Sequence, residues 1–240
     1  MTCYTGMIAP VPLASRAAYL EHARAIWPLF RRYGARRMVD TWGVDTPPGK
    51  LTDYQRAVAA QADEAITFAW IEWPDRTTAD AAWPAIEADP DMAAMASMPF
   101  DGSRVIMGGF APLVSVGQTA GAGYYQGFLL AVPKANRAAY EKMAREAWGM
   151  FAGHGALGTV EAWGEDVPHG RKTDMYRATL AEPDEAILFS WIAWPDRATC
   201  DAAGRKMQAE MAGRDMPQMP FDGRRMIWGG FETLFDSGDN

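Results

Sequence analysis

The chain has 240 residues, of which 49% are hydrophobic and 22% are charged. This average globular composition excludes a disordered, collagen-like or membrane-spanning chain. The excess of 30 Asp and Glu over 23 Lys and Arg argues against a general nucleic-acid-binding protein, because such proteins need a clustered basic face.

The first part of the chain predicts a strand, a helix and three further strands. The apolar run 6–11 ends between two prolines and predicts a strand, and a helical pattern follows from Ser15 to Tyr33. Alternation over 38–44 predicts the second strand. Two more strand-like runs, 54–60 and 65–73, are separated by a polar turn and predict a hairpin.

A second helix is predicted from Asp75 to about Ala88, and residues 104–110 close the unit as a strand. The order of elements is that of a ferredoxin-like α+β domain, in which an antiparallel sheet carries both helices on one face. We therefore predict an α+β fold.

The chain repeats itself at a fixed spacing. YTGMIAPVPLASRAAY from Tyr4 aligns with YQGFLLAVPKANRAAY from Tyr125, and the offset of 121 residues still holds where MPFDG from Met98 meets MPFDG from Met219. We predict two ferredoxin-like units, 1–113 and 122–240, joined by a linker of small residues over 114–121.

The predicted strands are apolar on both faces, as ITFAWIEW and ILFSWIAW illustrate. A sheet with helices on one face leaves its other face bare, so a second layer must cover it. We predict that the antiparallel sheets of the two units face each other as a pseudo-dimer within one chain.

Three strings in the second unit, AWGEDVPHGRKTDMYRA, DEAILFSWIAWPDR and MPFDGRRMIWGGFE, resemble the YbaA family of small bacterial proteins. That family is a domain-of-unknown-function group in the dimeric α+β barrel superfamily. The resemblance implies that a barrel built from two chains elsewhere is built here from a tandem duplication. Superfamily relatives include cofactor-free monooxygenases and haem-dependent enzymes with a cleft between sheet and helices, but a shared fold does not supply a reaction.

Paired carboxylates and arginines are the candidates for catalysis. A carboxylate shielded by a nearby indole has a raised pKa and could exchange a proton with a carbon acid, while a guanidinium on a strand could hold an anionic group. The candidate catalytic residues are Asp45, Asp166, Arg56 and Arg177. The alternative interpretation is structural, with aspartates that form turns and Asp–Arg ion pairs that hold loops.

A second set of paired residues could line the same clefts. Tryptophans at strand ends could form an aromatic wall, and the remaining polar residues could form its rim. The candidate ligand-binding residues are Trp42, Trp163, Asp53, Asp174, Arg104 and Arg225. Core packing is the alternative for the tryptophans. Methionines also cluster at 92, 95 and 98 and at 211, 216 and 219, as packing residues or as an adaptable ligand wall.

We expect no metal and no cofactor. His22, His154 and His169 have no histidine counterparts at the 121-residue offset, and Cys3 and Cys200 lack the spacing of metal ligands. The unmatched His154, His169 and Trp228 suggest that the second copy has diverged chemically.

We predict a soluble protein that binds a small metabolite in a barrel cleft. Whether it is a cofactor-free proton-transfer or oxygenase-type enzyme, or a non-catalytic module for self-association or partner binding, is left open. The N-terminal sequence has no signal-peptide pattern, which predicts a cytoplasmic protein without membrane or nucleic-acid partners. A further homo-oligomer also stays open.

Overall fold

The computed structural model describes residues 1–94, 98–213 and 218–239. The first unit, as the term is used below, consists of β1 (Cys3–Pro12), α1 (Arg16–Arg32), β2 (Arg37–Asp45), α2 (Tyr54–Ala57), β3 (Glu64–Trp73), α3 (Arg76–Ala88), α4 (Pro90–Ala94) and β4 (Ile106–Gly117). The second unit consists of β5 (Tyr124–Pro133), α5 (Arg137–Gly153), β6 (Gly158–Asp166), α6 (Met175–Ala178), β7 (Glu185–Trp194), α7 (Arg197–Met211) and β8 (Ile227–Asp236). None of the helices in the described part of the chain is long and apolar enough to span a membrane.

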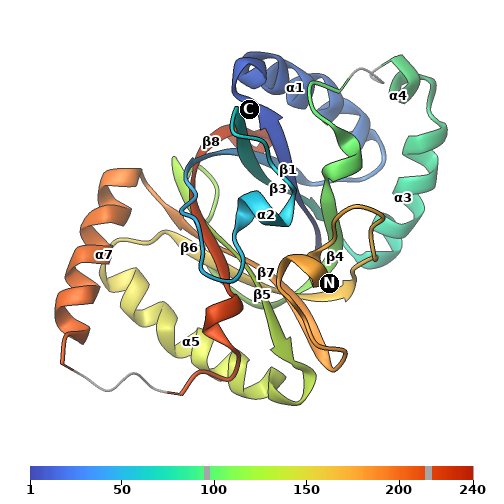
Figure 1. Ribbon diagram of the computed structural model, residues 1–240. Coiled ribbons are helices and arrows are strands. Elements are labelled where there is room, and N and C mark those ends of the chain that lie inside the picture. Colours follow the sequence, from blue (N-terminus) through green and yellow to red (C-terminus); the bar gives the residue numbers. More distant parts are fainter. Residues whose placement is uncertain (95–97, 214–217, 240) are drawn as a thin grey trace.

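The strands form one closed antiparallel barrel in the order β1-β3-β2-β8-β5-β7-β6-β4 (Figure 1). Each unit supplies a four-stranded sheet, and the two sheets are joined where β2 pairs with β8 and where β4 pairs with β6. Closure leaves no sheet edge free to pair with another chain. The predicted fold, a pseudo-dimeric α+β barrel within one chain, is confirmed.

The barrel interior is filled by aromatic rings that both units supply. Phe68 stacks on its counterpart Phe189 at a centroid distance of 4.1 Å, and Trp70 stacks on Trp191 at 4.4 Å. A Cβ atom at Gly6 would lie 2.9 Å from the Phe189 ring, so the close approach of ring and strand requires glycine there. This packed interior explains why the strand sequences are apolar on both faces.

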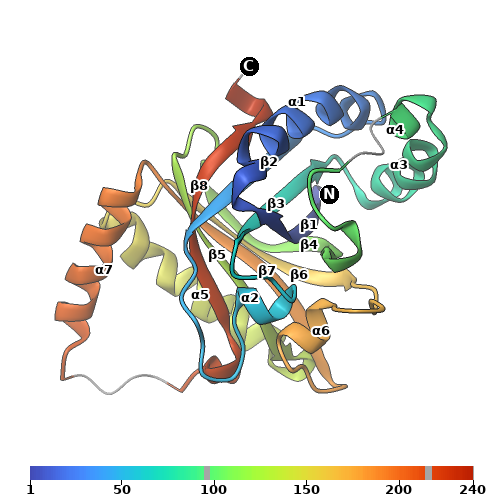
Figure 2. The ribbon, with the colours of Figure 1, turned by 45° about the horizontal axis from the view of Figure 1, so that its top comes forward.

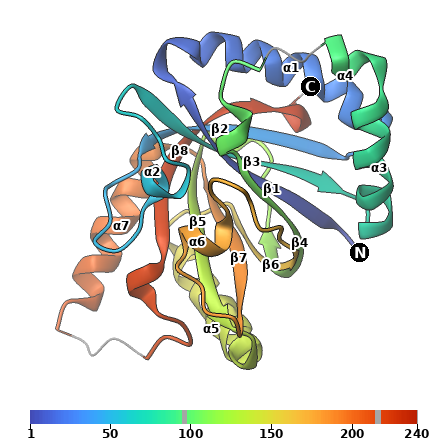
Figure 3. The ribbon, with the colours of Figure 1, turned by 45° about the vertical axis from the view of Figure 1, so that its right-hand side comes forward.

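The long helices cover the outside of the barrel in two separate layers. Helices α1 and α3 pack outside the strands of the first unit, and α5 and α7 lie outside those of the second (Figures 2 and 3). The short helices α2 and α6, one from each unit, lie in contact with each other.

Two predictions about the elements were wrong. Residues 54–60 do not form a strand, because the Asp53 carboxylate accepts a hydrogen bond from the backbone N–H of Arg56 and caps the short helix α2. Strand β4 also continues beyond the predicted end of the unit, so residues 114–117 pair with β6 rather than forming part of a flexible linker.

Candidate functional site

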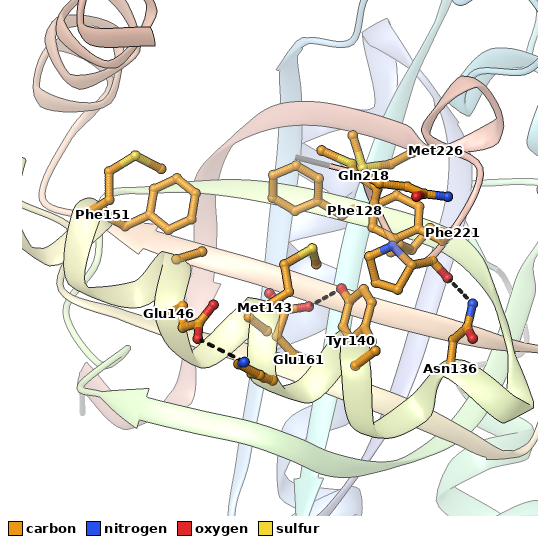
Figure 4. A pocket seen from close by; sticks show the side chains of 18 of the residues that line it. Phe128, Asn136, Tyr140, Met143, Glu146, Phe151, Glu161, Gln218, Phe221 and Met226 are labelled. Carbon is orange, nitrogen blue, oxygen red and sulfur yellow. Dashed lines mark hydrogen bonds and ion pairs between the residues drawn. The ribbon is translucent and has the colours of Figure 1, made fainter. Parts of the chain in front are cut away.

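A cleft of about 930 Å³ lies in the second unit, between α5 and the outer face of β5, β6 and β7. Figure 4 shows its lining from close by. The walls are mostly apolar and combine aromatic rings with methionine side chains, among them Phe128, Met143, Met150, Phe151, Phe221 and Met226. This volume lies within the usual range of small-molecule sites, about 300–1,000 Å³.

A tyrosine and a carboxylate meet between α5 and the sheet, where both line the cleft (Figure 4). The hydroxyl of Tyr140 on α5 donates a hydrogen bond of 2.7 Å to Oε2 of Glu161 on β6. Burial raises the pKa of Glu161 above its ordinary value, although the hydroxyls of Ser190 and Tyr140 oppose the shift. Burial also raises the pKa of Tyr140 well above its ordinary value, so Tyr140 stays the donor.

The first unit contains the same pair at the equivalent positions. The hydroxyl of Tyr19 on α1 donates a hydrogen bond of 2.7 Å to Oδ1 of Asp40 on β2. Asp40 is only 4% exposed, and its Oδ2 is buried with no hydrogen-bond partner among the described residues. Burial raises the pKa of Asp40 to about 6. The duplicated pair is therefore closed off in this unit.

Larger side chains fill the corresponding space in the first unit. Trp83 on α3 packs against Phe30 and Trp73, at centroid distances of 5.7 and 6.5 Å. Its counterpart on α7 is Gly204, where an added Cβ would meet no atom within 4 Å.

Helices α1 and α5, which face the sheet in the two units, also differ in how fully their side chains are buried. Ile26 and Leu29 of α1 are 9% and 1% exposed, and their counterparts on α5 are Ala147 and Met150. Met150 is 37% exposed and lies on the wall of the cleft. Smaller or displaced side chains in the second unit thus leave space that the first unit fills.

The carboxylates predicted to be catalytic lie at strand ends, outside this cleft. Asp166 forms an ion pair of 2.8 Å with Arg76, which joins the end of β6 to the start of α3 across the two units. The pair borders a smaller cavity of about 260 Å³ beside Gly108 and Gly109. Asp45 lies at the end of β2 opposite Gly230 of β8.

Arg56 and Arg177 lie on the short helices α2 and α6, so the prediction that they lie on strands was wrong. Their side chains are about half exposed, and each donates a hydrogen bond to a backbone carbonyl of the preceding loop. Asp53 and Asp174 are buried and cap these two helices. All four residues therefore hold the loops between the second and third strands of each unit.

Arg104 and Arg225 each make a two-pronged contact with a buried glutamate, Glu64 or Glu185, with the shorter bond at 2.6 Å. The contact lowers the pKa of both glutamates. Arg104 also donates a hydrogen bond to the backbone carbonyl of Ala59, which has a left-handed backbone conformation with φ of 49°. Such a conformation is unfavourable for alanine, and this hydrogen bond helps to hold it.

Trp42 and Trp163 are 5% and 7% exposed and pack on the outer face of the sheet. A guanidinium covers each ring, Arg16 at 5.7 Å from the Trp42 centroid and Arg137 at 5.2 Å from that of Trp163. None of the ten candidate residues lines the cleft of the second unit. Their predicted roles in catalysis and ligand binding stay predictions.

The tyrosine–carboxylate pairs were not predicted from the sequence, because the two residues of each pair lie 21 positions apart and the carboxylate is Asp in one unit and Glu in the other. A signal was present: both copies contain Arg-Ala-Ala-Tyr on the helix and an acidic residue two positions before the strand tryptophan. Met211 and Met219 of the predicted methionine cluster do line the cleft. Met95 and Met216 lie outside the described residues.

In the described part of the chain, no group of three or more His, Cys, Asp or Glu side chains is arranged so that it could hold a metal ion.

The sequence profile of one protein family, described as "Protein of unknown function (DUF1428)", matches residues 2–102 and again residues 123–223. The chain is 45% identical over 114 residues to the uncharacterized protein YbaA of Escherichia coli strain K12, an alignment that covers 47% of this chain and 97% of YbaA. The YbaA of Shigella flexneri gives the same values.

Solved structures confirm the architecture. An anthrone oxidase-like protein superposes with a TM-score of 0.60 at 10% identity, covering 98% of this chain and 92% of that one. A candidate monooxygenase from Fusobacterium nucleatum subsp. nucleatum ATCC 25586 superposes with a TM-score of 0.57 at 8% identity, covering 98% of this chain and 93% of that one. At such low identity these matches establish the fold alone.

Proposed function

The chain belongs to the DUF1428 family, as a tandem duplication of its domain, and on this premise we propose that it binds a small metabolite in the cleft of the second unit. We further propose that Glu161 exchanges a proton with that metabolite, in a cofactor-free enzyme of the proton-transfer or oxygenase type.

The observation that carries this proposal is a half-buried carboxylate on the wall of an open apolar cleft. Even partial removal of a carboxylate from water is costly, and perturbed carboxylates of this kind cluster at functional sites. A general base works best when its pKa approaches the pH at which it operates, and the raised pKa of Glu161 moves it in that direction. Tyr140 holds Oε2, and the nearby Ser190 hydroxyl makes no hydrogen bond of regular geometry, so we take Oε1 as the atom that meets a ligand.

The structural neighbours add support for the reaction class. One is named anthrone oxidase-like and the other is a candidate monooxygenase. Oxygenase-type chemistry in such a cleft would begin with deprotonation of the substrate beside Glu161, and molecular oxygen would be the co-substrate. The non-catalytic alternative, a surface for self-association or a partner protein, predicts no dependence on Glu161.

A thermal-shift screen with a metabolite library tests the proposal. Each hit is measured again on a variant with Ala147→Ile on the wall of the cleft and Gly204→Trp, which would place an indole beside the lining residue Phe151 as Trp83 lies beside Phe30. A ligand at 100 times its dissociation constant adds about 2.7 kcal/mol to the free energy of unfolding. Hits that disappear in the filled variant support the proposal, and hits that all persist contradict it.

Among such hits, turnover separates the enzyme from the binding module. Hydrogen–deuterium exchange of the bound ligand, followed by NMR, should be fast with the wild-type protein and slow with Glu161→Gln. Asp40→Asn is the matched control, because it makes the same change in the closed unit, where exchange should stay at the wild-type rate. Equal exchange with Glu161→Gln would exclude Glu161 as the proton acceptor.

A further inference from the structure

We propose that the cleft selects a neutral, flat, hydroxylated ligand, whose O–H group donates a hydrogen bond to Glu161, and that it rejects carboxylate anions. This inference rests on the proposed function, since it concerns the same cleft, and it names the class of ligand.

The polar groups at this point of the cleft define what the ligand must offer. An ionised carboxylate can only accept hydrogen bonds, and one oxygen of Glu161 already accepts from Tyr140. Within the described residues no hydrogen bond of regular geometry reaches Oε1 of Glu161, although the Ser190 hydroxyl lies close enough to lower the pKa of this carboxyl. A ligand group that meets this oxygen therefore has to be a donor.

A second polar group lies beside the first and exists only in this unit. Ser190 on β7 pairs directly with Glu161 of β6 in the strand register and is 1% exposed. Its hydroxyl is buried beside the carboxylate of Glu161 and makes no hydrogen bond of regular geometry with the described residues. The counterpart in the first unit is Ala69, which has no polar group. A ligand hydroxyl could donate to Glu161 and accept from Ser190 at the same time, because a hydroxyl has both capacities.

The charges around the cleft disfavour an anion. Among the residues that the structure describes, the charged ones in its lining are Lys142, Glu146 and Glu161, and none of the described arginines lines it. Lys142 lies 3.9 Å from Glu146, and both side chains are largely exposed at the rim. Within the described part of the chain no cation is paired with Glu161 to attract a carboxylate, and the like charge of Glu161 would repel one.

The apolar walls favour a flat ring system. Phe128 of the sheet and Phe151 and Met143 of α5 line the slot between helix and strands (Figure 4). Aromatic faces stack on flat ligands, and thioether side chains adapt to them and make favourable contacts with rings. The ligand class is thus an apolar ring compound with a hydroxyl group.

Three probes of similar shape test the inference at neutral pH: 2-naphthol, 2-methoxynaphthalene and 2-naphthoate. They differ only in offering a donor, no donor or an anion. Isothermal titration with the wild-type protein should show 2-naphthol binding about tenfold more tightly than the methyl ether, because a hydrogen bond to a charged group supplies that factor. The naphthoate should bind more weakly than either.

The variants locate the preference. Glu161→Gln should abolish the advantage of 2-naphthol over the ether, because Tyr140 keeps the amide oxygen engaged and the NH₂ group can donate alike to the hydroxyl oxygen and to the ether oxygen. Tyr140→Phe retains the carboxylate and should retain the preference, as should Asp40→Asn in the closed unit.

The three ligands on the wild-type protein decide the matter even if a variant fails to fold. Equal affinity for 2-naphthol and its ether, or tightest binding of the naphthoate, would overturn the inference while the cleft still stands as a binding site. Failure of all three to bind would overturn the inference and count against the proposed function itself.

Discussion

The two units share one backbone plan and one tyrosine–carboxylate pair, yet only the second leaves that pair open to a cleft. In the first unit Trp83 packs between the helices and the carboxylate of Asp40 is sealed. In the second unit Gly204 stands where Trp83 would be, and Glu161 lines the cleft. The comparison teaches that a site can arise by removing side chains from one copy of a duplicated core, while the other copy keeps the barrel stable.

This division of roles follows from the energetics of packing. Each ring that is buried in a filled core stabilises the folded state. An open cleft lacks this stabilisation where function needs space. A single chain with two copies can therefore keep one unit tightly packed and let the other diverge.

The largest predicted effect concerns a feature that the units share. Arg104→Ala and Arg225→Ala each leave a buried glutamate without its partner, which should cost about 3–5 kcal/mol of unfolding free energy. Denaturant unfolding checks both. Similar losses of unfolding free energy in the two variants would show that the units differ only in their outer layer of helices. A loss below about 1 kcal/mol in one variant would contradict this view.

The second prediction uses the closed carboxylate. The pKa of Asp40 is raised from 3.8 to about 6, so the folded state holds the proton more tightly than the unfolded state. The associated stability is present below about pH 4 and is lost as the pH rises through 6, a loss of about 3 kcal/mol. Asp40→Asn should remove this loss, so the difference in unfolding free energy between variant and wild type should grow in favour of the variant over that range. A difference that is flat with pH would show that Asp40 is not buried as described.

The third prediction contrasts the two positions that separate the units. Trp83→Ala should cost about 2 kcal/mol, because the half-buried indole loses its contacts with Phe30 and Trp73. Gly204→Ala should instead gain up to about 1 kcal/mol, because alanine favours the helix and the added Cβ meets open space. Thermal unfolding of both variants gives the signs. A loss at Gly204 would mean that this position is not open.

The smallest effect is expected at the ion pair between the units. Arg76 and Asp166 are 36% and 66% exposed, so Arg76→Ala should cost less than about 1 kcal/mol, and the cost should disappear at 1 M salt. Arg197→Ala is the control, because Arg197 pairs with Asp201 inside α7 and bridges nothing between units. A large cost that persists in salt would mean that the joint between the units depends on this pair.

Much of the fold could be predicted from the sequence, because the two units share specific motifs as well as a pattern of hydrophobic residues. Residues 54–60 were wrongly predicted as a strand, because the helix that Asp53 caps has only four residues and is too short to show a helical period. Strand β4 extends into 114–117 because β6 of the other unit offers backbone partners there, and such a partner is not visible in a local pattern.

The candidate site could not be predicted in the same way. A search for residues that are identical at the offset selects what the units share, such as Arg104 and Arg225, and those residues proved to hold loops and turns. The cleft depends on positions that differ, such as Trp83 against Gly204 and Ala69 against Ser190. A cytoplasmic location and any further homo-oligomer stay predictions.

The most direct measurement of the central claim is NMR of the protein labelled with ¹³C at its methionine methyl groups. Met143, Met150 and Met226 line the cleft of the second unit, whereas Met7 and Met38 pack with the helices of the first. Addition of 2-naphthol should shift the first three signals and leave Met7 and Met38 unchanged. Comparable shifts of Met7 and Met38, or shifts of those two alone, would contradict the assignment of the open site to the second unit.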